Sequence, residues 1–369
     1  MSNDTRPEIR FPGFTEDWEE RKLGELTESF DGKRVPIDSD LRISGKYPYY
    51  GATGIIDYVD DYIFNGEYVL LAEDGANIIM RNYPVAYLTQ GKFWLNNHAH
   101  IMRMRNGSNY FLVQVLEKID YKKYNTGTAQ PKLNSKIVKN IELKIPHIEE
   151  QQQIGNFFKQ LDDIIALHQR KLDLLKETKK GFLQKMFPKN GAKVPEIRFP
   201  GFTGDWEQRK LGELAESFEY GLNASAKKFD GSNKYIRITD IDDINHKFNQ
   251  NGVTSPDIDF ANADNYKLKK GDILFARTGA SVGKTYMYRE SDGLVYYAGF
   301  LIRARIKSKI SSEFVFQTTF TDSYNQFIKI TSQRSGQPGV NAEEYSNFKI
   351  MIPNYEEQDA IGCFFKQLD

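Results

Sequence analysis

The sequence has a single cysteine, Cys363, in 369 residues, and it lacks any apolar run long enough to cross a membrane. One cysteine excludes a disulfide framework and a cysteine-rich zinc site, and it is typical of a reducing compartment. The polar N-terminal stretch MSNDTRPEIR has none of the features of a secretory signal peptide. Together these features predict a cytoplasmic protein that does not associate with membranes.

Net charge is also absent, since 50 Lys and Arg balance 50 Asp and Glu. The charge is unevenly distributed, however. Residues 20–76 contain 6 basic and 12 acidic side chains, residues 77–144 contain 11 and 3, and the second half of the chain repeats this bias more weakly. A basic surface apart from an acidic one would suit phosphate on one side and a protein partner on the other. Ordinary solvated surface is the competing interpretation.

Motifs for catalysis are missing as well. The stretch Gly279–Thr285 resembles a phosphate-binding loop, but that loop needs glycine where the chain has Thr278, and a helix where β-type residues follow. The five histidines have no metal-ligand spacing beyond His98-x-His100. The chain has neither an Asn/Asp-Pro-Pro-aromatic tetrapeptide for methylating a flipped base nor a Gly-x-Ser-x-Gly elbow. These absences predict a non-catalytic chain without a metal site.

Two segments occur twice. Residues 7–30, PEIRFPGFTEDWEERKLGELTESF, return at 195–218 with 21 of 24 positions identical, and residues 145–162, IPHIEEQQQIGNFFKQLD, return at 352–369 with 13 of 18 identical. The inserts between them, roughly Asp31–Lys144 and Glu219–Met351, show little resemblance to each other. A repeated framework around different inserts indicates that the framework meets one kind of surface twice, whereas each insert meets something different. A tandem duplication without functional symmetry is the alternative.

A long helix is predicted between the repeats, at Glu149–Met186. Its apolar residues recur at alternating spacings of four and three, the pattern of a helix that buries a narrow stripe against another long helix. At 1.5 Å per residue the helix would be roughly 55 Å long. The alternative is the core helix of a single domain. The partner-facing seam is predicted to consist of Ile154, Phe158, Leu161, Ile165, Leu172, Leu175 and Phe182.

Each insert has the pattern of a small mixed domain. Short β-rich runs, such as those at 68–71 and 273–275, are separated by Asn-Gly and similar turn signals. Helical patterns appear at 110–119 and 312–330. The predicted fold class is therefore α+β, with two mixed α/β domains joined by a long coiled-coil-type helix.

Gly/Pro-shaped loops at Thr126–Asn134 and Arg334–Asn341 lie at the same offset before the two C-terminal anchors. They contain the amides, hydroxyls and cations that contact base edges and phosphates. Together with the Gly-rich loop at Arg277–Thr285 and several polar or aromatic clusters, they suggest a set of candidate DNA-binding residues. Core packing is the competing interpretation for any one of the clusters. The candidates are Lys33, Arg34, Tyr50, Arg81, Asn97, Thr126, Thr128, Gln130, Lys132, Lys227, Lys228, Arg277, Thr278, Ser281, Lys284, Tyr297, Arg334, Ser335 and Gln337.

Four motifs together point to one known family. They are Trp-Glu-x-Arg-Lys-Leu-Gly-Glu-Leu at 18–26 and 206–214, the loops Gly-x-x-Gln-Pro-x-x-Asn at 127–134 and Gly-Gln-Pro-x-x-Asn at 336–341, Ile-Pro…Glu-Glu-Gln at 145–151 and 352–358, and Gly-Asp-Ile-Leu-Phe-Ala-Arg-Thr-Gly at 271–279. With them, the chain resembles the specificity (S) subunit of Type I restriction–modification enzymes over nearly its whole length.

The resemblance implies a role and a domain plan. Two target-recognition domains, residues 1–147 and 188–351, would each recognise one half of a split double-stranded DNA target. The helix at 148–187 would set their spacing and, with the start of a distal helix at 352–369, would seat two modification subunits. Restriction subunits would join that assembly. S-adenosylmethionine, ATP and Mg would bind to the partner subunits, and this chain would have no cofactor of its own.

The second helix anchor departs from this plan because it stops at Asp369, whereas the first continues for another 25 residues or so. We therefore expect a truncated distal helix, and either self-association through the exposed seam or instability there. Two other hypotheses stay open: a nucleotide-dependent enzyme that uses the Arg277–Thr285 loop, and an adaptor that binds only proteins.

Overall fold

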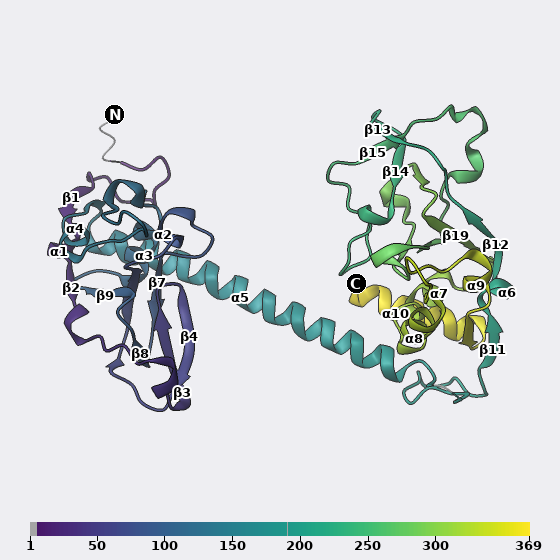
Figure 1. Cartoon of the computed structure of the whole chain (residues 1–369), viewed down its shortest axis with the longest axis horizontal. Coiled ribbons are helices and arrows are strands. Elements are labelled where there is room, and N and C mark those ends of the chain that lie inside the picture. The colour runs from purple at the N-terminus through teal and green to yellow at the C-terminus, as the bar shows by residue number, and fades with distance from the viewer. Residues whose placement is uncertain (1–5, 190) are drawn as a thin grey trace. The chain divides into compact units, whose positions relative to one another are not determined.

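The computed structural model describes residues 6–189 and 191–369, which form two compact units that divide between Gln169 and Arg170. Residues 1–5, the start of the stretch used above to exclude a signal peptide, lie outside this description. Both units combine antiparallel sheets with short helices, and a single long helix, α5 (Ile148–Lys185), contributes residues to each (Figure 1).

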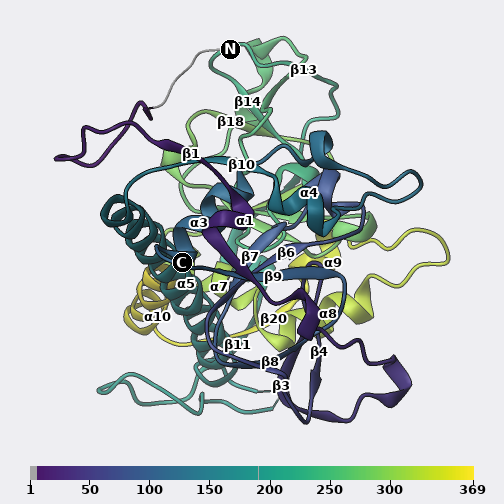
Figure 2. The same ribbon diagram turned by 90° about the vertical axis from the view of Figure 1, so that its left-hand side faces the viewer.

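The first unit has two four-stranded sheets and one two-stranded sheet. One large sheet has the antiparallel order β2-β9-β6-β7, and the other, β4-β3-β8-β5, includes the parallel pair β3–β8. Figure 2 shows β6, β7 and β9 side by side. The strands are β1 (Glu19–Lys22), β2 (Thr27–Ser29), β3 (Ser44–Gly51), β4 (Gly54–Val59), β5 (Phe64–Asn65), β6 (Tyr68–Ala72), β7 (Ala86–Thr89), β8 (Lys92–Leu95), β9 (Ala99–Met104) and β10 (Glu142–Ile145).

The second unit repeats this plan. Its first sheet has the antiparallel order β12-β19-β16-β17, and its second, β13-β15-β14-β18, again contains one parallel pair, β14–β18. The strands are β11 (Glu207–Lys210), β12 (Ala215–Tyr220), β13 (Ala226–Lys228), β14 (Lys234–Ile236), β15 (Thr254–Pro256), β16 (Asp272–Ala276), β17 (Thr285–Met287), β18 (Val295–Tyr297), β19 (Leu301–Ile306) and β20 (Lys349–Ile352).

The helices other than α5 are short. The helical pattern at 312–330 was predicted as one stretch, but the structure divides it into two helices. The division follows from Thr321, whose hydroxyl caps the second helix by accepting from the N–H of Tyr324. The helices are α1 (Leu23–Leu26), α2 (Asn77–Met80), α3 (Asn109–Glu117), α4 (Ser135–Lys139), α6 (Leu211–Leu214), α7 (Ser312–Thr318), α8 (Asp322–Thr331), α9 (Ala342–Ser346) and α10 (Tyr355–Leu368).

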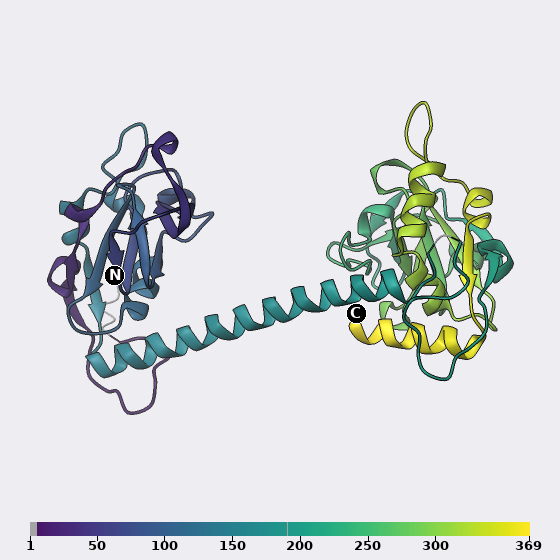
Figure 3. The same cartoon turned by 90° about the horizontal axis from the view of Figure 1, so that it is seen from below.

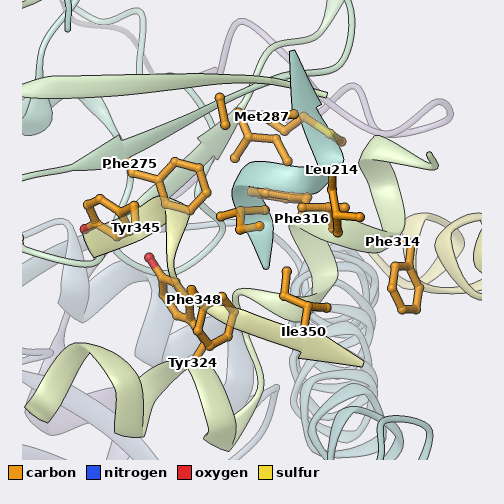
Figure 4. Packing of buried hydrophobic residues seen from close by; sticks show 14 of the residues in the cluster. Leu214, Phe275, Met287, Phe314, Phe316, Tyr324, Tyr345, Phe348 and Ile350 are labelled. Atoms are coloured by element: carbon orange, nitrogen blue, oxygen red, sulfur yellow. The ribbon is translucent and has the colours of Figure 1, made fainter. Parts of the chain in front are cut away.

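The central strands β6 and β16 are buried at every position. Their continuous runs, Tyr-Val-Leu-Leu-Ala and Asp-Ile-Leu-Phe-Ala, suit strands that are covered on both faces. In the second unit, Phe275 of β16 packs 4.9 Å from the ring of Tyr345, within an aromatic cluster that also holds Tyr324 and Phe348 (Figure 4). Each unit therefore has its own core around its central strand.

The repeated framework closes each unit with the same ion pair, which we call the clasp. In the first unit Arg10 donates from Nε and Nη2 to the two carboxylate oxygens of Glu150, both at 2.7 Å. In the second unit Arg198 makes the equivalent pair with Glu357 at 2.6 and 2.7 Å. Both glutamates are fully buried. The clasp ties the segment that precedes each insert to the first turn of the helix that follows it.

The same two ends are also joined through the backbone. β1 pairs antiparallel with β10, and β11 pairs in the same way with β20. The chain therefore enters and leaves each insert on neighbouring hydrogen-bonded strands.

The helix predicted at 149–186 is confirmed as the continuous helix α5, 38 residues long. Ile154 packs against the core of the first unit, and Phe182 against that of the second, where its ring lies 5.0 Å from Phe364 of α10. Figure 3 shows the C-terminal end of α5 running alongside α10. Leu175 is half-buried. The remaining seam residues are exposed in this chain: Phe158 (37%), Leu161 (38%), Ile165 (65%) and Leu172 (46%).

Candidate nucleic-acid interface

A tight turn follows β6, the central strand of the first unit. It packs against the loop Thr126–Asn134, which the sequence predicts to contact DNA. Gly75 has a φ of 106°, which favours glycine, and its N–H donates to the carbonyl of Pro131 at 3.0 Å. The N–H of Leu133 donates to the carbonyl of Glu73 at 2.7 Å. We call residues 73–75 and 130–133 the turn–loop pair of the first unit.

The second unit builds the same arrangement from different residues. Gly279 has a φ of 75°, and its N–H donates to the carbonyl of Pro338 at 3.0 Å. The N–H of Val340 donates to the carbonyl of Arg277 at 2.9 Å. The turn–loop pair of the second unit therefore consists of residues 277–279 and 337–340.

An ion-pair network surrounds the turn of the first unit, with Glu73 at its centre. Arg34 donates to the Glu73 carboxylate at 2.6 Å and to the carbonyl of Ala99 at 2.8 Å. The ammonium of Lys132 lies 3.6 Å from the same carboxylate. The side chains of Arg34 and Glu73 are only 13% and 15% exposed, whereas that of Lys132 is 53% exposed. Lys132 is therefore the cation that this network presents to solvent.

His100 joins the turn–loop pair to the rest of the first unit. One ring nitrogen lies 2.8 Å from the Asp31 carboxylate and the other 2.8 Å from the carbonyl of Leu133. Both ring nitrogens of His100 therefore have an oxygen partner. Burial by itself would raise the pKa of Asp31, but the hydrogen bond and charge of His100, the Ile101 N–H and the charge of Arg34 together hold that pKa below its usual value.

Arg277 of the second unit has different surroundings. Its guanidinium lies over the ring of Tyr220, 5.0 Å from the centroid. Among the residues described in the structure, no acceptor lies within hydrogen-bonding distance of that guanidinium. The strand beneath it is anchored, because the buried Tyr345 hydroxyl donates to the carbonyl of Ala276 at 2.7 Å. Arg277 is thus an oriented cation with unused donors.

Most candidate residues gather at the two turn–loop pairs or on the loops that join them. In the first unit these are Arg34, Asn97, Thr126, Thr128, Gln130 and Lys132, with Lys33 beside them, and in the second they are Arg277, Thr278, Ser281, Arg334, Ser335 and Gln337. Four others lie elsewhere. Lys227 and Lys228 are exposed on β13, Arg81 pairs with Glu117 at 3.0 Å, and the ring of Tyr50 packs 5.5 Å from Phe93.

Three candidates have side chains that are turned inward. Tyr297 is fully buried, so this fold leaves it no surface to offer to DNA, and we remove it from the contact set. The ammonium of Lys284 pairs with Asp243 and donates to the carbonyl of Ile241 at 3.1 Å. The Arg34 guanidinium is held by the Glu73 network. Lys284 and Arg34 therefore stabilise the candidate interface from within.

Glu73 and Asp74 are not among the residues predicted from the sequence, although a signal was present. VLLAEDG at 69–75 and ILFARTG at 273–279 share a buried apolar run, an alanine and a glycine at the same offsets. Only an alignment of the two inserts at this point reveals that Glu73-Asp74 and Arg277-Thr278 occupy the same place.

Residues 6–189 and 191–369 contain no group of three or more His, Cys, Asp or Glu side chains that could hold a metal ion. Within the same residues, no helix is both long and apolar enough to span a bilayer.

The two similar units, each with its own turn–loop pair, define a tandem two-domain protein, and comparison with known proteins identifies the family. The model of the Type I restriction modification DNA specificity domain matches residues 15–177 and 203–369. The chain belongs to this family: it is a DNA specificity subunit of a Type I restriction–modification system. The predicted family and the non-catalytic role are thereby confirmed.

Individual relatives agree. The chain is 25% identical over 377 residues to a Type I restriction enzyme specificity subunit of Methanocaldococcus jannaschii, covering 96% of this chain and 86% of that one. It is 35% identical over 167 residues to a type I specificity subunit of Haemophilus influenzae, a match that spans 45% of this chain and 42% of the relative.

A solved structure supports the fold. The crystal structure of the Type I restriction–modification S subunit from M. genitalium superposes with a TM-score of 0.68 at 14% identity, over 96% of this chain and 89% of that one. The predicted α+β class, with two sheet-containing regions and a long helix between them in sequence, is confirmed.

Proposed function

We propose that each unit recognises one half of a bipartite double-stranded DNA target. The observation that carries this proposal is the repeated turn–loop pair, which has the same backbone hydrogen bonds in both units but different side chains. A shared framework that presents different hydrogen-bonding groups suits the recognition of two different half-sites. The domains that act in this way are proposed to be residues 1–147 and 188–351.

The proposal is tested by exchanging one insert. A host would express the chain with its cognate modification subunits, and adenine methylation of the genome would be mapped. We expect an interrupted, two-part motif. Replacing residues 219–351 with the insert of another family member should change one half of the motif and leave the other half and the spacing unchanged. A motif that changes in both halves would contradict the assignment of one half-site to each unit.

We further propose that residues 148–187, together with the helix at 352–369, seat two modification subunits. The support is the exposed stretch of the α5 seam, where Ile165 is 65% exposed in the chain alone. S-adenosylmethionine would bind the modification subunits, ATP and Mg would bind the restriction subunits, and this chain would supply no cofactor. Such an assembly acts on cellular DNA, so we propose that it works in the cytoplasm.

The seam is tested with paired charge substitutions. Ile165→Asp should abolish co-purification with the modification subunits. Arg170→Asp is the matched control, because it lies about 140° away around the same helix and is also exposed. If the seam instead joins two copies of this chain, Ile165→Asp would convert a dimer of the isolated chain to a monomer in sedimentation and leave assembly with the modification subunits intact.

A further inference from the structure

The two turn–loop pairs share one backbone but differ in charge. Glu73 and Asp74 of the first unit occupy the places of Arg277 and Thr278 in the second. The glycine that ends each turn, and the Gln-Pro of the facing loop, are the same in both. The difference between Glu73-Asp74 and Arg277-Thr278 therefore changes the hydrogen-bonding character of the surface, whereas the backbone that presents these side chains is the same.

In the second unit the turn presents a donor. Arg277 is stacked on Tyr220, it follows a strand that is anchored by the Tyr345 hydroxyl, and its guanidinium has no acceptor among the described residues. The chain has equal numbers of acidic and basic side chains, so an arginine held rigidly and left unpaired is distinctive. A guanidinium in this state matches the paired O6 and N7 acceptors of guanine in the major groove.

In the first unit the turn presents an acceptor. The carboxylate of Glu73 is turned inward to Arg34, but that of Asp74 is 23% exposed and is held by His98, whose Nδ1 lies 3.0 Å from both of its oxygens. A carboxylate oriented in this way accepts hydrogen bonds and donates none. It matches the exocyclic amino group of cytosine or adenine. It would repel the O6 and N7 acceptors that a guanine presents at the same place.

We propose that Arg277 and Asp74 are specificity-determining residues of the two half-sites: Arg277 pairs with a guanine, and Asp74 accepts from a base amino group. The proposal rests on the proposed function, in which each unit recognises one half of the target. It adds that the two units use neighbouring positions of the same turn, with opposite hydrogen-bonding character.

The test measures base discrimination by the assembled complex. The motif is first mapped by methylation with the parent chain. Affinities are then measured for that motif and for duplexes in which one base pair of a half-site is replaced. For one G·C pair in the half-site of the second unit, the parent complex should discriminate by on the order of 10- to 100-fold. Arg277→Gln and Arg277→Lys should both reduce this ratio to about 2-fold or less, because lysine keeps the charge but loses the paired donors.

Two further variants complete the design. Asp74→Asn should lower discrimination at one position of the other half-site only. Lys309→Gln, which removes an exposed cation of the second unit outside the turn–loop pair, should change no ratio. All variants should unfold at the temperature of the parent chain, since both target side chains are at least partly exposed.

The possible outcomes distinguish failure of this inference from failure of the proposed function. If Arg277→Gln weakens binding to every duplex equally and keeps the discrimination ratio, Arg277 contacts phosphate and the inference is wrong. If the parent chain gives a two-part motif but neither variant alters its discrimination, the inference fails and the proposed function stands. If the parent chain directs no methylation and binds no duplex selectively, the proposed function fails and the inference fails with it.

Discussion

The clasp gives a quantitative prediction for the variant Arg198→Ala. The substitution removes two hydrogen bonds to the Glu357 carboxylate, at 2.6 and 2.7 Å, and leaves that fully buried charge without its partner. Breaking a buried ion pair in this way typically costs about 3–5 kcal/mol. The Arg198 side chain is 17% exposed, so water can reach that end of the pair, and we take the lower figure of about 3 kcal/mol.

This loss should be visible as a lower unfolding temperature of the second unit. For a unit of this size 1 kcal/mol corresponds to roughly 2–4 °C, so the midpoint should fall by about 6–12 °C in scanning calorimetry. Hydrogen exchange should locate the loss of protection at residues 195–206 and 355–368. Arg10→Ala should have the same effect on the first unit, and Arg209→Ala, whose pair with Glu207 is exposed, should have none. A midpoint within 2 °C of the parent for Arg198→Ala, or equal loss of protection in both units, would refute the reasoning.

Three other predictions concern the second unit. Gly362→Ala should cost about 1–3 kcal/mol in chemical denaturation, because the new Cβ would lie 2.9 Å from that of Glu313 and 3.1 Å from the Phe314 nitrogen. Tyr345→Phe removes one of two donors to the buried Ala276 carbonyl, which keeps the Gly283 N–H at 3.0 Å, so the urea midpoint should fall by an amount equivalent to about 0.5–1.5 kcal/mol. Burial lowers the pKa of His246, so the unfolded chain binds that proton more readily and stability should fall as the pH drops below about 6.5. His246→Asn, which tolerates the φ of 55° at this position, should flatten the dependence of stability on pH between about 7 and 5.

The parts of the fold that could be predicted from sequence have a local signal. The helix at 149–186 has a regular apolar spacing, and the structure places its ends at Ile148 and Lys185. The buried strands β6 and β16 follow from their continuous apolar runs. In both cases neighbouring residues determine the element, so a pattern within one short window suffices.

The candidate site was only partly predictable because it depends on contacts between distant residues. The loop at Thr126–Asn134 has a recognisable composition, but its partner Glu73 lies more than 50 residues earlier, and no local pattern indicates that pairing. The same limit explains Tyr297, which has the composition of an exposed aromatic cluster and becomes buried when β18 pairs with β14. Burial of that kind is set by tertiary packing and not by the residue type.

The pairing of β1 with β10 and of β11 with β20 has a consequence for evolution. Because the two ends of each insert are held side by side, the chain between them is a closed loop whose entropy cost depends only weakly on its length. Each doubling of such a loop adds about 0.6 kcal/mol, less than many single substitutions in a core. The framework can therefore accept inserts of different lengths and internal sequences at little thermodynamic cost, and a different surface can arise by replacing what lies between the two paired strands.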